Sequence, residues 1–363
     1  MTANVLLLGC GDAGLLIADG LLRQGGVGRL VLADFNAGRV GRSVAMLACC
    51  HDAAVAFEEV DGRDRAALAT LIRKVRPDLV IQAASLVSPW SIIGRDHPVA
   101  GAIGAAGIGI QLPGQLPVVL NLMQVIRDLG RNIPVANLSM PDIIHPILAT
   151  RGLAPTIGLG NVSIQHLRVL AALKARREAS PAGRAPLVRL IGHHQQVYGV
   201  MQATPPDDPA NRVRVYLGEA GERDDGLAYE GTPFPPGPVY NVITAAAALP
   251  VLGALLPEAV PRRFSAPGPL GLPGGYPVTI DQGEVALDLP AGVDPDEAVA
   301  FNHRIGRLDG VAEIGPDGAV RFTGAAEAAV RDVDPCLAEP LDPWNLADRT
   351  GRLLQIIRDM GPV

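Results

Sequence analysis

The first part of the chain alternates short apolar runs with amphipathic stretches. Residues 5–8 are all apolar and lead directly into glycines spaced G-x-G-x-x-G, after which residues 15–22 show helical periodicity. A second run, 29–34, is apolar at its centre and ends in an acid. Apolar runs of this length that stop at turn residues are typical of buried strands. The pattern predicts a strand, a glycine-rich turn, a helix and a second strand.

The same alternation continues to about residue 150. We expect strands at 53–57, 77–84 and 133–138, and helices at 63–75, 116–129 and 142–149. Strand–helix–strand units at this spacing form right-handed crossovers between parallel strands. We therefore expect an α/β fold in which residues 1–150 form a doubly wound parallel sheet.

From residue 151 the pattern is mixed. The expected elements are helices at 162–177, 239–256, 295–308 and 343–360, strands at 187–191, 278–280 and 285–289, and a hairpin at 312–322. Residues 203–239 are rich in proline, glycine and charge, and no element is assigned to them. We expect residues 151–363 to form a second, mixed α+β domain that supplies the substrate-binding and catalytic side chains.

Residues 85–112 show neither the helical nor the strand periodicity of apolar residues. They contain many glycines, together with Trp90, Arg95 and His97. Long loops in a compact domain usually have a function. We expect this segment to be a mobile loop that becomes ordered over bound substrate, with Arg95 as a substrate contact.

Composition narrows the class of protein. The chain has 363 residues, of which 48% are hydrophobic and 19% are charged, and its formal net charge is −6. This balance favours neither nucleic acid nor an anionic membrane surface as a partner. The uncharged stretches 98–126 and 231–257 contain prolines, so we expect buried segments there, with a homodimer contact at 239–256. We expect a soluble cytoplasmic protein that binds neither nucleic acid nor membrane.

Cysteine usage points the same way. The four cysteines, Cys10, Cys49, Cys50 and Cys336, show no C-x-x-C or Cys/His ligand spacing. This usage indicates reduced thiols rather than disulfides or a zinc site. We expect no bound metal.

The glycines have the spacing of a dinucleotide-binding (Rossmann) turn. In such a turn Gly9 allows the tight bend, Gly11 lets the backbone approach a pyrophosphate, and Gly14 lets the helix pack closely on the strand. Asp34 follows Gly14 by 20 residues and ends the second strand. An acid there accepts hydrogen bonds from the adenosine ribose and repels a 2′-phosphate, so NAD is expected rather than NADP. A purely structural glycine turn in another α/β protein is the alternative.

Three further segments, taken with the glycine turn and Asp34, resemble parts of the lactate/malate dehydrogenase superfamily. Residues 137–144 are similar to the segment after that family's fifth strand. Residues 160–168 are similar to the helix that carries its acid and substrate-binding arginine, and 190–194 to the strand end that presents its catalytic histidine. The resemblance extends over roughly the first 200 residues.

The resemblance implies roles for particular residues. Ser163 stands at the family's orienting aspartate and His166 at its carboxylate-binding arginine. We expect Ser163 to contact substrate, and His166 to contact substrate or relay a proton. His194, or His193 if the register shifts by one, matches the catalytic histidine. Tyr198 is expected to hydrogen-bond a substrate carbonyl.

The resemblance also implies that Asn137 lies near the nicotinamide. The full set of expected cofactor contacts is Gly9, Gly11, Asp12, Ala13, Gly14, Asp34, Ala83 and Asn137. Because position 166 has no guanidinium, Arg95 or Arg168 is the remaining source of a clamp for a substrate carboxylate.

Residues 63–84 are similar, more weakly, to the first domain of saccharopine-reductase-like and extended short-chain enzymes. The short-chain mechanism needs a Tyr-x-x-x-Lys pair. The two lysines of the chain are Lys74 and Lys174, and neither lies four residues after a tyrosine. The short-chain mechanism is therefore excluded.

We predict an NAD(H)-dependent oxidoreductase that moves a hydride between nicotinamide and a carbonyl or hydroxyl carbon of a small molecule, with a histidine exchanging the proton. Two alternatives remain open. One is an opine- or saccharopine-type dehydrogenase acting on a C–N bond, and the other is a dinucleotide-binding protein without turnover.

Overall fold

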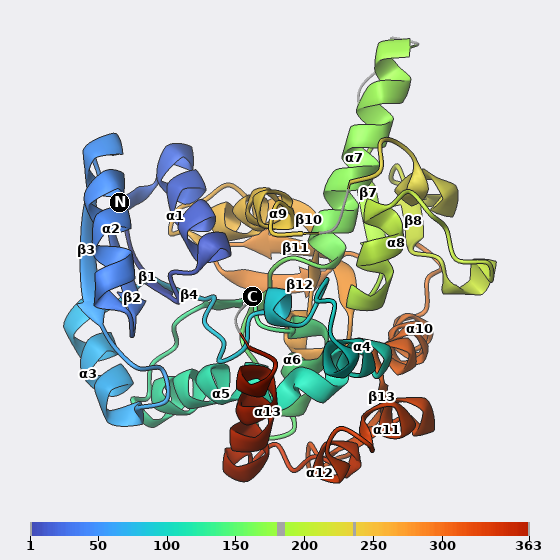
Figure 1. The fold of residues 1–363 in the computed structure, drawn as a ribbon. Coiled ribbons are helices and arrows are strands. Elements are labelled where there is room, and N and C mark those ends of the chain that lie inside the picture. Colours follow the sequence, from blue (N-terminus) through green and yellow to red (C-terminus); the bar gives the residue numbers. More distant parts are fainter. Residues whose placement is uncertain (1, 180–185, 235–236, 362–363) are drawn as a thin grey trace.

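A computed structural model describes residues 2–179, 186–234 and 237–361. Its first half, blue to green in Figure 1, is built on a six-stranded sheet in the order β3-β2-β1-β4-β5-β6. Every neighbouring pair in this sheet is parallel. The strands are β1 (Ala3–Leu8), β2 (Val27–Asp34), β3 (Ala54–Glu59), β4 (Leu79–Gln82), β5 (Val135–Asn137) and β6 (Ile157–Gly158). The expected α/β fold with a doubly wound parallel sheet is confirmed.

Helices cover both faces of this sheet, as the continuous apolar character of its strands requires. Val5 and Leu7 of β1 belong to one core, which includes residues of α1 and α2. Leu6 and Leu8 belong to the core on the other face, which includes residues of α3 and α5. The helices of this half are α1 (Asp12–Gln24), α2 (Ala37–Cys50), α3 (Arg65–Val75), α4 (Pro98–Ala105), α5 (Leu112–Asp128) and α6 (Pro141–Ala149).

The second half contains three small antiparallel sheets. Their strands are β7 (Val188–Ile191), β8 (Arg214–Leu217), β9 (Glu222–Arg223), β10 (Arg262–Pro267), β11 (Gly275–Asp281), β12 (Glu284–Leu287), β13 (Val311–Ile314) and β14 (Val320–Phe322). β11 pairs with β12, and β13 with β14. The paired strands expected near 278–289 and the hairpin expected at 312–322 are therefore confirmed.

The helices of the second half are α7 (Val162–Ala179), α8 (Val197–Met201), α9 (Tyr240–Leu255), α10 (Pro295–Gly306), α11 (Gly324–Val330), α12 (Pro335–Ala338) and α13 (Ala347–Asp359). α9 packs on α1, and its buried residues belong to the same core as Val5 and Leu7. The contact is close, because a Cβ added at Gly20 of α1 would lie 2.8 Å from Leu249 Cδ1. A helix of the second half thus covers one face of the first half's sheet.

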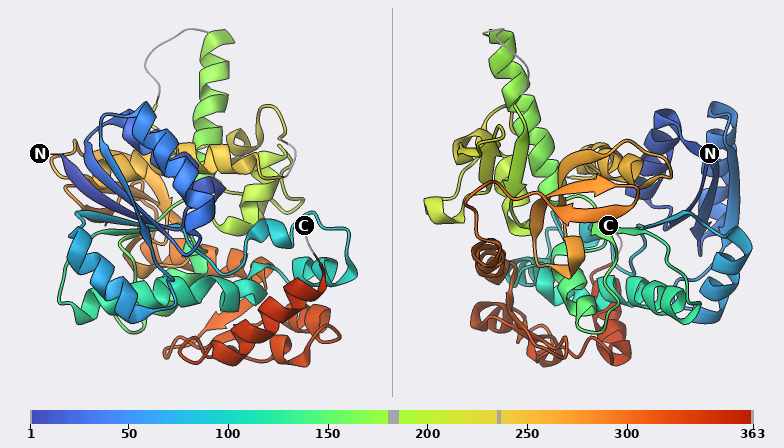
Figure 2. Two further views of the ribbon diagram at one scale, coloured as in Figure 1. Left: turned by 60° about the vertical axis from the view of Figure 1, so that its left-hand side comes forward. Right: turned by 180° about the vertical axis from the view of Figure 1, so that it is seen from behind.

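One expectation about an individual segment needs correction, and one helix was missed. Residues 85–112 are not a continuous loop, because they contain α4 and the 3₁₀-helices η1 (Pro89–Ser91) and η2 (Ile108–Gln111). Apolar residues of this segment share a small core with α13, and both views of Figure 2 show α13, in red, beside the teal helices. The helix α2 was not expected from the sequence.

No element was expected in the stretch 203–239, which the structure describes apart from residues 235–236. It contains β8 and β9 together with the 3₁₀-helices η4 (Pro209–Asn211) and η5 (Asp225–Tyr229). The other 3₁₀-helices are η3 (His194–Gln196), η6 (Pro269–Gly271) and η7 (Arg307–Asp309).

Two further observations concern the domain boundary and the apolar helices. The boundary that we expected at residue 150 falls between α6 and β6, which is still part of the large sheet. Within the described ranges, no single helix is long and apolar enough to cross a membrane. The segments 98–105 and 108–128 meet that test only as a pair bent by 111°.

Candidate functional site

A cavity of about 1020 Å³ opens along the carboxyl ends of the parallel strands, where ligands bind in open α/β sheets. This volume is at the upper end of small-molecule sites, which span about 300–1,000 Å³. The first half contributes the glycine turn, the end of β2, and residues after β4 and β5. The second half contributes these lining residues: Leu159, Gly160, Asn161, Ile164, His194, Gln195, Val197, Tyr198, Tyr240, Asn241, Thr244, Leu308 and Asp309.

The three glycines of the turn have different surroundings. Gly9 has φ +100°, and a Cβ there would lie 2.4 Å from the main-chain nitrogen of Ala84. A Cβ on Gly14 would lie 2.2 Å from the Gly9 carbonyl oxygen. Gly11 has no described atom within 4 Å of its added Cβ, and it lines the cavity. The structure therefore requires glycine at 9 and 14, whereas Gly11 leaves open space in front of the α1 N-terminus.

Asp34 lies at the cavity end of β2 and is 6% exposed. Its Oδ2 accepts a hydrogen bond from the Cys10 main-chain N–H (2.8 Å). Its Oδ1 accepts one from the Asn36 N–H (2.9 Å). Arg39 lies across the same edge, with Nη2 3.6 Å from Asp34 Oδ2 and 3.3 Å from the Cys10 carbonyl oxygen. These contacts fix the carboxylate beside the glycine turn.

The remaining expected cofactor contacts divide into two groups. Asp12, Ala13 and Ala83 line the cavity. Asn137 is fully buried and is not among the lining residues. Its Nδ2 donates to the Ser139 carbonyl (2.9 Å), and its Oδ1 accepts from the Ser139 N–H (3.0 Å). Asn137 therefore shapes the turn after β5 and presents Ser139, rather than its own amide, to the cavity.

The two adjacent histidines after β7 have separate positions. His194 lines the cavity with a side chain that is 33% exposed. His193 is 2% exposed and is not a lining residue. The Nδ1 atom of each lies 3.1 Å from the same oxygen, Oδ2 of Asp309. Asp309 lies at the end of η7, so a residue from the last fifth of the chain completes this cluster.

The contacts within this cluster shift the pKa values of His194 and Asp309 in opposite directions. Burial alone would lower the pKa of His194, but the carboxylates of Asp309 and Asp142 outweigh it and raise that pKa above the ordinary value. Burial alone would raise the pKa of Asp309, and the contacts with His194 and His193 hold it well below its usual range. The pair thus stabilises a proton on the His194 imidazole and a negative charge on Asp309.

A second buried carboxylate, Asp142 of α6, holds the main chain in place. Its Oδ2 accepts from the His194 N–H (2.7 Å) and from Asn161 Nδ2 (2.8 Å). Its Oδ1 has no hydrogen-bond partner among the described residues. Burial raises the pKa of Asp142, although His193 and His194 act in the opposite direction. Asp142 connects α6, the start of α7 and the segment that carries His194.

Backbone strain is found at the same place. Met140 has φ 37° and Asn161 has φ 47°, and both residues line the cavity. Such left-handed conformations cost a non-glycine residue of the order of 1–3 kcal/mol, and they tend to occur at functional sites.

The structure places His166 and Ser163 away from the cavity lining. His166 stacks on Phe264 with ring centroids 4.0 Å apart, and its Nδ1 lies 3.0 Å from Ser265 Oγ. Burial lowers the pKa of His166 to about 3. Ser163 Oγ donates to the Ser265 carbonyl (2.8 Å). Both residues pack against β10 in the interior.

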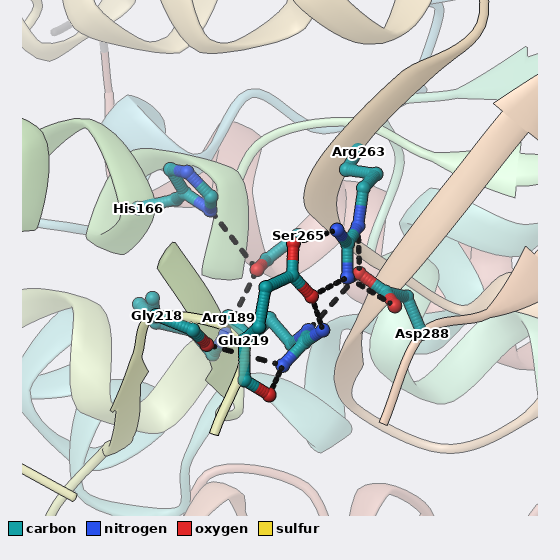
Figure 3. A network of polar contacts seen from close by, with 8 residues as sticks. His166, Arg189, Gly218, Glu219, Arg263, Ser265 and Asp288 are labelled. Atoms are coloured by element: carbon teal, nitrogen blue, oxygen red, sulfur yellow. Dashed lines mark hydrogen bonds and ion pairs between the residues drawn. The ribbon is translucent and has the colours of Figure 1, made fainter. Parts of the chain in front are cut away.

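Figure 3 shows the surroundings of His166. The imidazole points at Ser265, whose Oγ also accepts from the Leu190 N–H (2.9 Å). An ion-pair network lies beside them, in which two arginines share two carboxylates: Arg189, Arg263, Glu219 and Asp288. This network joins β7 to β10 and to the residues following β8 and β12.

The two arginines considered as carboxylate clamps have main-chain partners. Arg95 lines the cavity, and its Nη2 donates to the carbonyl oxygens of Met360 (2.7 Å) and Gly361 (3.0 Å). Arg168 is not a lining residue, and its Nη2 donates to two carbonyls in the segment 230–232. Tyr198 lines the cavity and is 60% exposed.

Sequence reasoning missed Asp309 and Asp142. Asp142 lies within the recognised segment 137–144, where an acid in the first turn of a helix is also a common stabilising feature. Asp309 lies in the part of the chain that showed no resemblance, and nothing in the sequence distinguishes it from other acids that precede a glycine.

Comparison with solved structures identifies the fold. A malate dehydrogenase from Plasmodium falciparum is 11% identical with a TM-score of 0.53, covering 93% of this chain and 100% of that chain. The apo malate dehydrogenase from Picrophilus torridus is 13% identical with a TM-score of 0.51, covering 85% and 97%. No protein-family model and no curated protein matches this chain. The similarity to the lactate/malate dehydrogenase superfamily, expected from the sequence, is therefore confirmed for the fold.

Proposed function

We propose that this protein is an NAD(H)-dependent oxidoreductase acting on a small molecule, with His194 as the proton donor and acceptor. The observation that carries the proposal is the single cavity that joins the G-x-G-x-x-G turn to a histidine backed by a buried carboxylate. A homodimer and a cytoplasmic location stay predictions from the sequence.

The residues at the glycine turn fit a dinucleotide. Gly11 leaves open the space that a pyrophosphate needs, and the N–H groups at the start of α1 face that space with the positive end of the helix dipole. Main-chain N–H groups fix both carboxylate oxygens of Asp34. Asp34 also follows the glycine turn at the spacing of the acid that binds the adenosine ribose in dinucleotide-binding folds. When bound, the nicotinamide would supply or accept the hydride.

His194 and Asp309 would carry out the proton transfer. Asp309 accepts the Nδ1 proton of His194, which fixes the tautomer and leaves Nε2 for the substrate oxygen. In the reducing direction the carbonyl carbon gains a hydride and its oxygen gains the Nε2 proton, so a carbonyl becomes an alcohol. In the oxidising direction Nε2 takes the proton back. The carboxylate stabilises the protonated ring, which gives up its proton in reduction and is formed in oxidation.

The first prediction tests this assignment. We expect His194→Ala to lower turnover about 10²–10⁴-fold, the usual contribution of a general acid or base, while the NADH dissociation constant stays unchanged. Oxidation of NADH with a panel of carbonyl compounds measures the first quantity, and calorimetry measures the second.

The matched control is His51→Ala, since His51 pairs with Asp19 outside the cavity lining. The variant His193→Ala tests the alternative in which the register shifts by one residue and His193 exchanges the proton. Full turnover in His194→Ala would contradict the proposal. A requirement for an amine would indicate C–N chemistry, and NADH binding without any oxidation would indicate a binding protein.

A further inference from the structure

We propose that the substrate of this site is an uncharged carbonyl compound or alcohol with an apolar substituent next to the reacting carbon, and not a 2-oxo or 2-hydroxy acid. This inference rests on the proposed function, because it assigns the part of the cavity next to His194 to the substrate.

The first argument concerns the positively charged side chains that line the cavity and the partners they already have. Of the described residues lining the cavity, two are arginines, Arg39 and Arg95. Arg39 lies at the Asp34 end, 3.6 Å from that carboxylate. Arg95 donates to the main chain after α13, and those bonds join the segment 85–112 to the end of the chain. Four carboxylates also line the cavity: Asp12, Asp34, Asp61 and Asp309.

The position that matches the carboxylate-binding arginine of the similar family holds His166, which does not line the cavity. His166 lies in the interior on Phe264, and its low pKa of about 3 keeps it neutral. A substrate carboxylate is normally held by a bidentate guanidinium. Next to His194, a carboxylate would instead be placed near Asp309, whose negative charge already pairs with the proton of His194. Charge therefore favours a neutral substrate.

The second argument is the chemistry of the remaining polar groups. Gln111 lines the cavity, is 2% exposed, and its Oε1 has no hydrogen-bond partner among the described residues. An amide oxygen is an acceptor, so a hydroxyl or N–H donor satisfies it and a carboxylate does not. The neighbouring Gln115 already bonds to Ser139 and to the Val87 carbonyl.

The third argument is the apolar surface beside the His194–Asp309 pair. Leu308 directly precedes Asp309 and is 51% exposed, and Tyr198 follows His194 by four residues and is 60% exposed. Ile93 of the 85–112 segment is 44% exposed. All three line the cavity. Large exposed apolar side chains therefore lie on both segments that supply the pair, where a substrate substituent would cover them.

The experiment uses four carbonyl probes that separate charge from apolar bulk: pyruvate, methyl pyruvate, benzoylformate and methyl benzoylformate. We expect each ester to exceed its acid in kcat/KM at least about tenfold, since both guanidiniums of the cavity lining already have partners and the desolvation of a carboxylate is not compensated. Burial of the phenyl group should add about 10- to 100-fold. Calorimetric titration of the NADH-bound His194→Ala protein, which should bind NADH but turn over slowly, should rank the dissociation constants in the same order.

Variants of the chain sharpen the test. Leu308→Arg places a guanidinium beside the pair and should shift the preference toward the acids at least about tenfold, whereas Leu308→Gln should not. Tyr198→Ser should reduce the advantage of the phenyl group and leave the effect of charge. Val260→Arg, at a position 82% exposed and outside the cavity lining, is the control for added charge.

The possible results are distinguishable. Acids used as well as their esters, or esters that fail to bind the NADH complex, would overturn the substrate class while leaving the proposed function in place. Tight ester binding without NADH oxidation would support the substrate class and contradict the proposed function. Absence of NADH binding would remove both.

Discussion

At the scale of single residues, Asp309 gives His194 its chemical character. The Nδ1···Oδ2 contact of 3.1 Å holds the ring, and Asp309, with Asp142, raises the pKa of His194 against the effect of burial. Ser163, which stands where an orienting acid was expected, bonds instead to a main-chain carbonyl in the interior. The carboxylate therefore comes from a different part of the chain.

The effect of Asp309 can be measured through the pH dependence of carbonyl reduction. Reduction needs protonated His194, so its rate falls as pH rises through the pKa of that group. Asp309→Asn removes the charge that raises this pKa, so the fall should begin at lower pH. We also expect a loss of about 10²-fold or more in turnover, because the tautomer is no longer fixed. Steady-state rates across the pH range measure both effects.

The control for this variant is Asp281→Asn, at the exposed last residue of β11. It should leave both the rate and the pH profile unchanged. An unshifted profile in Asp309→Asn would mean that Asp309 does not act on His194.

Asp34 and Arg39 are the basis of a prediction about which cofactor the protein prefers. Asp34 would face a 2′-phosphate, so the native protein should bind NADH at least about tenfold more tightly than NADPH. In Asp34→Ser this preference should fall, because Arg39 loses its carboxylate partner 3.6 Å away and can bind a phosphate. Fluorescence titration of both cofactors measures the ratio.

Asp61 provides the matched control, since it is another carboxylate of the cavity lining and is paired with Arg63. Asp61→Asn should keep the native preference. Equal affinities of the native protein for the two cofactors would contradict the assignment of Asp34.

At the scale of elements, the segment 85–112 connects the cavity to the end of the chain. Its helix α4 contributes Ala100 and Ile103 to a small core that includes Leu353 of α13. Arg95 adds two hydrogen bonds to the main chain just after α13. The segment is thus folded and attached at one side, while Trp90 and Ile93 line the cavity.

We expect the amides of 85–112 to exchange with solvent faster than those of β1, and to gain protection when NADH and substrate are both bound. Arg95→Ala should speed exchange both in this segment and at the end of α13, since one side chain connects them. Hydrogen exchange read by mass spectrometry measures each peptide separately. Arg131→Ala, an exposed change after α5, should have no such effect. Full protection of 85–112 in the free protein would show a fixed element.

At the scale of the whole molecule, the two halves share a core and a cavity. α9 covers α1 and one face of the large sheet, and β6 adds to that sheet after residue 150. The proposed cofactor-binding residues come from the first half, whereas His194 and Asp309 come from the second. The proposed reaction thus depends on both halves being packed together.

Much of this architecture was predictable from the sequence, for a physical reason. Continuous apolar runs such as 5–8 can only be buried on both faces, and the glycine spacing admits one kind of turn between strand and helix. The parallel sheet, the glycine turn beside Asp34, and the hairpin at 312–322 follow from such local patterns. The position of His194 just after β7 also followed, from the apolar run 187–191 and from the resemblance of residues 190–194.

Only the tertiary structure decided what lies beside His194. Asp309 is 115 residues away in sequence, and no local period relates two side chains brought together by packing. The same holds for His166, whose burial on Phe264 depends on β10. Arg95 bonds to carbonyls 265 and 266 residues away. The sequence thus determined the sheet and the glycine turn through local periodicity, whereas long-range packing selected the side chains that meet at the site.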